Sequence, residues 1–441
     1  MIKFIFMLMF MMLMLVYNKK VMFYYNICFL MSFMYLFKYL FKDLIWISVG
    51  FYSKFDFYSY FLILLSMWIM GLVFMVIQLE VTNLKMIIFM MMLIILVFLF
   101  SVSNLLLFYL MFEVSLIPTF IMIIYWGNNF ERLKASFYLL MYTMFISLPL
   151  LIYLMKLFKI SMTYEIDLLK MNNFIYLSFF DYLMMFMAFL IKMPIYIFHI
   201  WLPKAHVEAP VYGSMILASI LLKLGSYGLL RFLEIFYMKS LEMSFMIFSV
   251  GIVGSLLVSL ICLVQIDMKS LVAYSSVVHM NMMLCSLYTM TKLGFMSAYI
   301  LMVSHGLCSS GLFFMVNLYY ERSMSRLMFF NKGMMMIHPS LSMWWMFYCA
   351  MNFSFPLSLN FISEIYMISV IISWDIMMMI YLMMICFFSS AYSLYLYSYI
   401  QHGGYYIESK KVQIIYMKDY LILILHFIPL FFIIFNLSML Y

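Results

Sequence analysis

Long apolar stretches recur along almost the whole chain, and they leave few folds open. A helix that crosses a lipid bilayer needs about 20 mostly apolar residues, and in lipid only a helix or a closed barrel satisfies its own backbone. Hydrophobic residues make up 69% of the 441 residues and charged residues 10%, whereas a soluble domain is about half apolar and about a quarter charged. The sequence therefore predicts an all-α polytopic membrane protein without a large aqueous domain.

Charged residues and segments with proline or glycine divide the apolar sequence into about fourteen predicted transmembrane helices. They are 2–16, 21–41, 58–78, 86–102, 104–125, 136–158, 181–199, 212–232, 243–265, 271–290, 294–319, 341–372, 376–399 and 415–437. Lysine and arginine are slightly more frequent in the loops that follow the odd-numbered stretches. This bias places those loops on the matrix or cytoplasmic side.

The amino-acid usage is skewed in a way that folding does not require. The chain has 55 methionines, 48 phenylalanines and 37 tyrosines, against 14 glycines and 8 prolines. Membrane spans favour glycine and proline, and they have no need of methionine over alanine. Because the frequent residues have AT-rich codons, the bias indicates an AT-rich genome, which is typical of an organelle.

Several classes of function find no support in the sequence. The net charge is +8, but no basic run with interleaved aromatic residues indicates nucleic-acid binding. The six cysteines lack the Cys-x-x-Cys spacing, so we expect buried thiols and no metal site. A polar loop predicted between two spans has only a weak metal pattern, and we expect its side chains to hold the loop by hydrogen bonds. Its polar residues are His199, Lys204, His206 and Glu208.

Two lysines, Lys192 and Lys223, lie inside apolar stretches. A lysine at the bilayer centre costs at least about 2.5–3.5 kcal/mol, so each needs a partner, a water-filled cavity or a function. Lys192 lies two residues before Pro194, which interrupts a helix, and a broken helix beside a buried charge is typical of ion sites in transporters. Lys223 is flanked by apolar residues and cannot easily reach the interface. We expect both lysines to gain and lose protons.

Two glutamates also lie deep in predicted spans. Glu113 is in the middle of 104–125, and Glu364 follows Pro356 in 341–372. Each is either a protonated acid hydrogen-bonded to a neighbouring helix or a partner for a buried cation. Ionisable residues within the membrane mark functional sites by default, so we favour the second alternative.

His279 and His305 each lie in an apolar stretch. Each is either a structural imidazole with its hydrogen bonds satisfied or a member of a proton relay, because imidazole both accepts and donates protons near neutral pH. The sequence leaves these alternatives open.

Several distinctive motifs lie between about residues 105 and 400, and the most specific is Leu-Pro-Lys-Ala-His-Val-Glu-Ala-Pro at 202–210. The others are Leu105–Pro118, Trp126-Gly-Asn-Asn-Phe-Glu-Arg-Leu, Lys192-Met-Pro, Leu221-Leu-Lys-Leu-Gly, Asp267-Met-Lys-Ser-Leu-Val-Ala-Tyr-Ser-Ser, Ser304-His-Gly-Leu and Tyr320-Glu-Arg. With these motifs the chain resembles the proton-pumping antiporter-like subunits of respiratory complex I.

The resemblance implies two inverted five-helix repeats, each with an interrupted helix, near Pro194 and near Pro356. The implied organisation is N-terminal helices at 1–102, a first repeat at 103–235, a second repeat at 243–400, and a C-terminal loop and last helix at 401–441. It also implies that Glu113 pairs with Lys192, that Lys223 and the histidines form a hydrated relay, and that Glu364 is the exit-side site. The implied catalytic residues are Glu113, Lys192, Lys223, His279, His305 and Glu364.

The implied function is proton translocation in the membrane arm of NADH:ubiquinone oxidoreductase, driven by electron transfer from NADH to ubiquinone in other subunits. NADH, FMN, iron–sulfur clusters and ubiquinone would belong to those partner subunits, and no cofactor or metal to this chain. The implied partners are other membrane-arm subunits, including neighbouring antiporter-like subunits, and membrane lipids. The implied location is the mitochondrial inner membrane, crossed many times.

Three alternatives compete with this function. A stand-alone cation/proton antiporter would use the same charges, but no aspartate pair lies deep in a span as a cation site. A haem cytochrome needs histidine pairs at a shared depth, which the seven histidines do not show. A purely structural subunit has no use for two lysines and two glutamates in hydrocarbon.

Overall fold

The computed structural model describes residues 2–17, 20–39, 57–77, 82–127, 129–171, 177–404 and 415–437. Within these residues the regular elements are helices, and no β-strand occurs. Ten of the described helical stretches are long and apolar enough to cross a membrane, and three shorter apolar helices accompany them. The predicted all-α polytopic membrane fold is confirmed, while the number of about fourteen spans stays a prediction.

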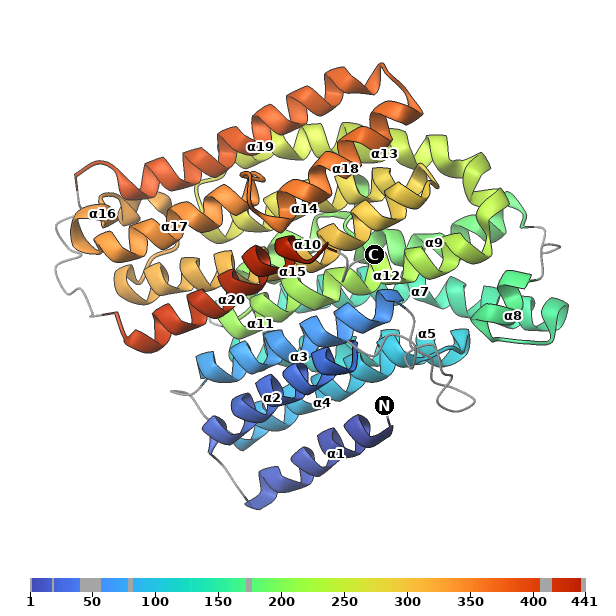
Figure 1. Cartoon of the computed structure of the whole chain (residues 1–441), viewed down its shortest axis with the longest axis horizontal. Coiled ribbons are helices and arrows are strands. Elements are labelled where there is room, and N and C mark those ends of the chain that lie inside the picture. The colour runs from blue at the N-terminus through green and yellow to red at the C-terminus, as the bar shows by residue number, and fades with distance from the viewer. Residues whose placement is uncertain are drawn as a thin grey trace. The chain divides into compact units, whose positions relative to one another are not determined.

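The chain divides into two compact units, and the first consists of Met1–Lys192 and Tyr227–Lys239. Within it α2 packs against α3 and α3 against α4 (Figure 1). Helix α7 packs against both α6 and α9. Its helices are α1 (Ile2–Tyr17), α2 (Val21–Tyr39), α3 (Phe57–Ile77), α4 (Asn83–Ser101), α5 (Leu105–Val114), α6 (Leu116–Trp126), α7 (Arg132–Ser161), α8 (Ile166–Met171), α9 (Phe179–Lys192) and the later part of α12 (Leu222–Ile235).

The second unit consists of Met193–Ser226 and Ser240–Tyr441. Its centre is formed by α14 and α15, which pack against each other and are almost wholly buried. Its elements are the 3-10 turn η2 (Tyr196–Phe198), α10 (Trp201–Glu208), α11 (Val211–Ile216), the π-helical turn η3 (Leu217–Leu221), the start of α12, α13 (Tyr237–Val264), α14 (Met268–Tyr288), α15 (Lys292–Ser323), η4 (Met328–Asn331), α16 (Met334–Ile337), α17 (Pro339–Asn352), α18 (Leu359–Trp374), α19 (Met378–Gln401) and α20 (Met417–Phe435).

Both predicted helix interruptions are present. Helix α9 ends at Lys192, two residues before Pro194, and α17 ends at Asn352, four residues before Pro356. Proline has no N–H to donate, and its ring clashes with the carbonyl four residues earlier, so it favours the end of a helix or a kink. The helices do end before Pro194 and Pro356, whereas Pro149 and Pro429 lie inside α7 and α20. The predicted span 341–372 is therefore two helices, α17 and α18, joined by a non-helical segment.

The predicted polar loop before Pro210 is wrong as a description of the backbone, because most of it is the helix α10. Pro203 lies in the first turn of α10, where proline is tolerated, and Pro210 follows the end of the helix. Within the predicted C-terminal region 401–441, residues 405–414 lie outside the described part of the chain.

Close packing inside the second unit leads to the first prediction. A Cβ atom added at Gly311 of α15 would lie 2.3 Å from the Tyr348 ring of α17. Tyr348 is fully buried and its hydroxyl donates a hydrogen bond to the Leu423 carbonyl of α20 at 2.7 Å, so the ring cannot move freely. We expect Gly311→Ala to destabilise the chain by about 1–3 kcal/mol, the usual cost of overpacking.

Thermal denaturation of the assembled membrane complex would measure this change. Gly404→Ala is the matched control, because a Cβ atom at Gly404 meets nothing within 4 Å. Equal transition temperatures for the two variants would contradict the predicted packing of α15 against α17.

Candidate functional site

The buried charges of the first unit lie where α5 and α9 end. Glu113 is in the last turn of α5, which begins at the capping residue Asn104 and ends beside the turn at Ser115. Both carboxylate oxygens of Glu113 are buried, and neither has a hydrogen-bond partner within the described part of the chain. A carboxylate that lacks a partner in low dielectric is costly, so Glu113 occupies a high-energy position unless it is protonated or solvated.

Lys192 is the last residue of α9 and is 4% exposed. Its Nζ atom donates a hydrogen bond to the backbone carbonyl of Phe112 at 2.9 Å and lies 3.0 Å from the centroid of the Phe112 ring. Phe112 directly precedes Glu113, so the ammonium group lies beside the turn that holds the glutamate. The structure shows the lysine bonded to the backbone, and a direct Glu113–Lys192 ion pair stays a prediction.

Lys223 of the second unit is held by a local departure from α-helical geometry. In the π-helical turn η3, the N–H of Leu222 bonds to the carbonyl of Leu217, five residues back, where an α-helix bonds four residues back. The carbonyl of Ala218 is thereby left for another donor. Lys223 Nζ supplies that donor at 2.5 Å, and Lys223 is fully buried.

The same ammonium group contacts a histidine of another helix. Lys223 Nζ lies 2.9 Å from Nδ1 of His305 on α15, and His305 is 2% exposed. Because an ammonium group can only donate, a charged Lys223 requires an unprotonated Nδ1 and leaves the ring proton on Nε2.

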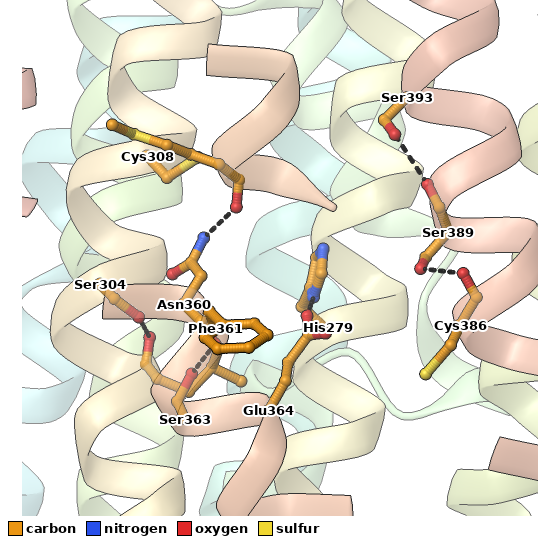
Figure 2. Close-up of polar contacts among 12 residues, drawn as sticks. His279, Ser304, Cys308, Asn360, Phe361, Ser363, Glu364, Cys386, Ser389 and Ser393 are labelled. Atoms are coloured by element: carbon orange, nitrogen blue, oxygen red, sulfur yellow. Dashed lines mark hydrogen bonds and ion pairs between the residues drawn. The ribbon is translucent and has the colours of Figure 1, made fainter. Parts of the chain in front are cut away.

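His279 of α14 continues this contact toward the break between α17 and α18. The ring centroids of His305 and His279 are 5.6 Å apart. Nδ1 of His279 lies 3.5 Å from Oε1 of Glu364 on α18, and Figure 2 shows these two side chains meeting. The second unit thus brings four of the predicted site residues into one series of contacts, three of them buried and the last partly exposed: Lys223, His305, His279 and Glu364.

Glu364 is positioned by the break that precedes α18. Ser358 caps α18 by accepting a hydrogen bond from the Phe361 N–H, and Asn360 Nδ2 donates to the carbonyl of Met351 at 2.8 Å, across the break. Ser354 and Leu357 within the break have φ of 60° and 73°, a left-handed conformation that residues with a Cβ adopt rarely. Strained backbone of this kind is often found at functional sites.

A small cavity borders the end of this series. His279 and Glu364 line it on one side, and Cys386 and Ser389 of α19 line the other. The second ring nitrogen of His279, Nε2, is buried and has no hydrogen-bond partner within the described residues. A cavity with several polar groups can hold water, which would extend proton transfer beyond direct contacts.

Other polar groups near these sites have structural partners. The His206 ring stacks on Phe313 at 4.7 Å, His199 bonds to the backbone carbonyl of Tyr196, and Lys269 Nζ donates to the carbonyl of Ala209 at 3.2 Å. Among the residues that the structure describes, no group of three or more His, Cys, Asp or Glu side chains could hold a metal ion.

Sequence reasoning missed Arg231, a buried arginine of the first unit. It lies at the end of the predicted span 212–232, where a basic side chain would ordinarily extend to the interface. In the structure it is 4% exposed, and its Nη2 donates to the hydroxyl of Tyr227 at 2.8 Å. Its position inside an apolar stretch was the available signal.

Comparisons with known proteins identify the family. A family model described as NADH:quinone oxidoreductase/Mrp antiporter matches residues 102–391, and one described as the amino terminus of NADH-ubiquinone oxidoreductase chain 4 matches residues 1–83. NADH-ubiquinone oxidoreductase chain 4 of Apis mellifera ligustica is 45% identical over 386 residues, which is 87% of this chain and 86% of that protein. This chain belongs to the NADH-ubiquinone oxidoreductase chain 4 family.

Two further comparisons agree. The chain 4 protein of Ceratitis capitata is 41% identical over 413 residues, 92% of each chain. A chain in the structure of respiratory complex I from Thermus thermophilus with bound NADH superimposes with a TM-score of 0.87, at 20% identity, over 97% of this chain and 93% of that one. At this identity the structural likeness establishes the fold alone.

Proposed function

We infer that this chain is a proton-translocating membrane-arm subunit of respiratory NADH:ubiquinone oxidoreductase. The observation that carries the inference is the series of contacts from the buried Lys223 through His305 and His279 to Glu364. Amine, imidazole and carboxyl groups can each hold and release a proton, and an apolar surrounding keeps other ions out. We assign NADH, FMN, the iron–sulfur clusters and ubiquinone to other subunits.

We propose that the four groups of the second unit pass protons in series. Lys223 would give a proton to Nδ1 of His305, at 2.9 Å. The His305 and His279 rings, 5.6 Å apart, would exchange it by rotation or through a bridging water. Glu364, 3.5 Å from His279, would receive it and act as the exit-side group.

In the first unit, Glu113 and Lys192 would form a separate proton-holding pair. We propose that redox energy released in other subunits changes the pairing of Glu113 with Lys192 and so biases Lys192 toward releasing its proton. A backbone-bonded lysine beside a glutamate without a hydrogen-bond partner would allow two arrangements, with the ammonium bonded either to the Phe112 carbonyl or to the carboxylate. Such a two-state element is what an electrostatic population shift requires.

The repeat boundaries 103–235 and 243–400 remain our proposal, and two features support them. Each proposed repeat contains one interrupted helix, ending at Lys192 in the first and at Asn352 in the second. Each also contains one isolated antiparallel bridge that joins the residue before one span to a residue after the next span. These bridges are Asn104 with Glu165 and Asp267 with Leu327.

The partners and location follow from family membership. We propose that the chain contacts neighbouring antiporter-like subunits and lipids in the mitochondrial inner membrane, since the similar chain 4 proteins are from animals. The alternative of a stand-alone cation/proton antiporter is not favoured, because the relatives with 38–45% identity are named as chain 4 of the oxidoreductase.

Replacing Lys223 with methionine tests the proposed series. Methionine matches the length of the lysine stem, so the packing is kept while the proton-binding group is lost. We expect proton pumping to fall by at least about tenfold, a cautious bound beside the roughly 10²–10⁴-fold that a positioned proton-transfer group typically contributes. Pumping coupled to NADH oxidation in assembled complexes would be the measurement. Lys134→Met is the matched control, because the Lys134 side chain is 75% exposed.

A Lys223→Met complex that assembles and pumps at the parental rate would overturn the series. A variant that fails to assemble would be followed by Lys223→Arg, which keeps the buried charge but does not deprotonate. We expect the arginine variant to assemble and not to pump, and normal pumping by it would equally reject the proposal.

A further inference from the structure

Aromatic rings fill part of the first unit next to Lys192. Phe108 and Phe112 come from α5, Phe189 from α9 and Phe232 from α12. The ring centroids are 5.5 Å apart for Phe112 and Phe189, 4.7 Å for Phe189 and Phe232, and 6.4 Å for Phe108 and Phe232. Rings at these separations are in contact. We call these four residues the aromatic layer.

The aromatic layer has no room for water. Its four side chains are at most 3% exposed. A Cβ atom added at Gly228 of α12 would lie 2.4 Å from carbon atoms of the Phe189 ring, so not even a methyl group fits between α9 and α12 here. A water site needs both space and polar partners, and the four packed rings carry no polar atom; the polar group that adjoins them is the Lys192 ammonium beside Phe112.

The layer separates Lys192 from one exposed end of the unit. On α9, Phe189 lies one turn before Lys192. On α12, Phe232 lies two residues before Glu234, which forms an ion pair with Lys170 of α8. The Lys170 and Glu234 side chains are 32% and 26% exposed, so this pair marks the boundary of the packed interior.

A fixed positive charge adjoins the layer. Arg231, next to Phe232 in the chain, is 4% exposed and donates to the Tyr227 hydroxyl at 2.8 Å. That hydroxyl donates in turn to the carbonyl of Phe100 at 3.2 Å, and the guanidinium carbon lies 5.0 Å from the centroid of the Tyr227 ring. Arginine stays charged at every physiological pH, and a fixed positive charge of this kind repels protons in narrow pores.

We propose that the aromatic layer and Arg231 form a proton barrier that closes one side of the first unit. The proposal rests on the proposed function, because a chain that holds a mobile proton at Lys192 loses its stored energy if that proton escapes directly to the nearer surface. The dry rings prevent a continuous chain of waters, and the guanidinium charge opposes a proton that approaches from the Lys170–Glu234 end. The proton on Lys192 is therefore retained until the coupled step moves it.

Passive proton flux through the assembled complex tests the barrier. The complex would be reconstituted in liposomes without NADH, and a potassium diffusion potential would drive protons inward. We expect Phe232→Ser, which replaces a ring by a hydroxyl and opens space for water, to raise this flux several-fold over the parent complex. Phe232→Leu keeps the site apolar and filled, and we expect the parental flux.

The charge is tested separately by two substitutions of Arg231. Arg231→Gln keeps a donor for the Tyr227 hydroxyl but removes the charge, so we expect a higher passive flux. Arg231→Lys keeps the charge, and we expect the parental value. In NADH-driven assays the leaky variants should continue to oxidise NADH while moving fewer protons per NADH.

An assembled Phe232→Ser complex with the parental passive proton flux would contradict the proposed barrier. The parental flux in Arg231→Gln would show that Arg231 is not part of the barrier. Passive flux requires no turnover, so these results are independent of whether Lys223→Met abolishes pumping. A Phe232→Ser variant that does not assemble would be replaced by Phe232→Thr, a less disruptive polar substitution with the same expected leak and the same contradicting result.

Discussion

Replacing Lys192 with alanine should lower both NADH oxidation and proton pumping while the complex still assembles. The substitution removes the ammonium group that bonds to the Phe112 carbonyl beside Glu113. Without a proton-binding cation at this position, the step that couples redox energy to proton release in the first unit cannot be completed. We expect pumping to fall by at least about tenfold, and oxidation to fall with it because the two processes are coupled.

The Lys192→Arg variant distinguishes two roles of Lys192: proton transfer, and a positive charge that only stabilises the structure. Arginine retains a positive charge and can bond to a carbonyl, but it does not deprotonate. We expect the arginine variant to assemble as well as the parent and to pump as poorly as Lys192→Ala. The measurement is proton uptake and NADH oxidation in the same vesicles, with subunit composition checked on native gels.

Normal pumping in Lys192→Ala would reject a place for Lys192 in the coupling path. Normal pumping in Lys192→Arg alone would show that only the charge matters at this position. Lys134→Ala serves as a control for the loss of a lysine, because Lys134 lies on the surface.

Replacing Glu364 with glutamine should abolish pumping with little change in packing. Glutamine has nearly the same shape and can still hydrogen-bond to His279, but it cannot accept a proton from Nδ1 of that ring at 3.5 Å. The proton that reaches His279 then has no acceptor beside the cavity lined by Cys386 and Ser389. We expect a loss of at least about tenfold in pumping.

Glu364→Asp and Glu242→Gln complete this test. Aspartate keeps the titrating group at a greater distance from His279, so we expect partial activity. Glu242 is exposed on α13, and its substitution by glutamine should have no effect. A Glu364→Gln complex that pumps protons at the parental rate would show that Glu364 is not part of the proton path.

A double-mutant cycle would show whether His279 and Glu364 act as one unit. Residues in the same proton path are strongly non-additive, since losing either one already stops transfer. We therefore expect His279→Gln combined with Glu364→Gln to pump no worse than Glu364→Gln alone. If the double variant instead lost pumping by the product of the two single-variant losses, the two residues would act independently.

The membrane topology could be predicted from the chain because its causes are local. Hydropathy over about 20 residues decides which segments can enter lipid, and the ten long apolar helices that the structure describes overlap predicted stretches. Pro194 and Pro356 favour helix ends through their own covalent geometry, although Pro149 and Pro429 lie inside α7 and α20. A charge within such a stretch is conspicuous without any structure, which is why Lys192, Lys223, Glu113 and Glu364 could be selected.

The polar segment before Pro210 could not be predicted correctly because two local signals compete there. Its charged side chains and prolines are typical of a loop. However, Pro203 is compatible with a first helical turn, and Trp201, Leu202 and Ala205 are buried on one side of α10. Tertiary burial therefore decided in favour of a helix.

The sequence by itself determined the class of fold and the identity of the charged groups, because each depends on neighbouring residues alone. Only the tertiary structure decided which groups meet. Lys223 and His305 are 82 residues apart in the chain, and their 2.9 Å contact depends on the rotation of two helices and on the π-helical turn that frees the Ala218 carbonyl. The aromatic layer likewise arises from rings on three helices. Such contacts are set by how whole helices pack, and no short stretch of sequence encodes that packing.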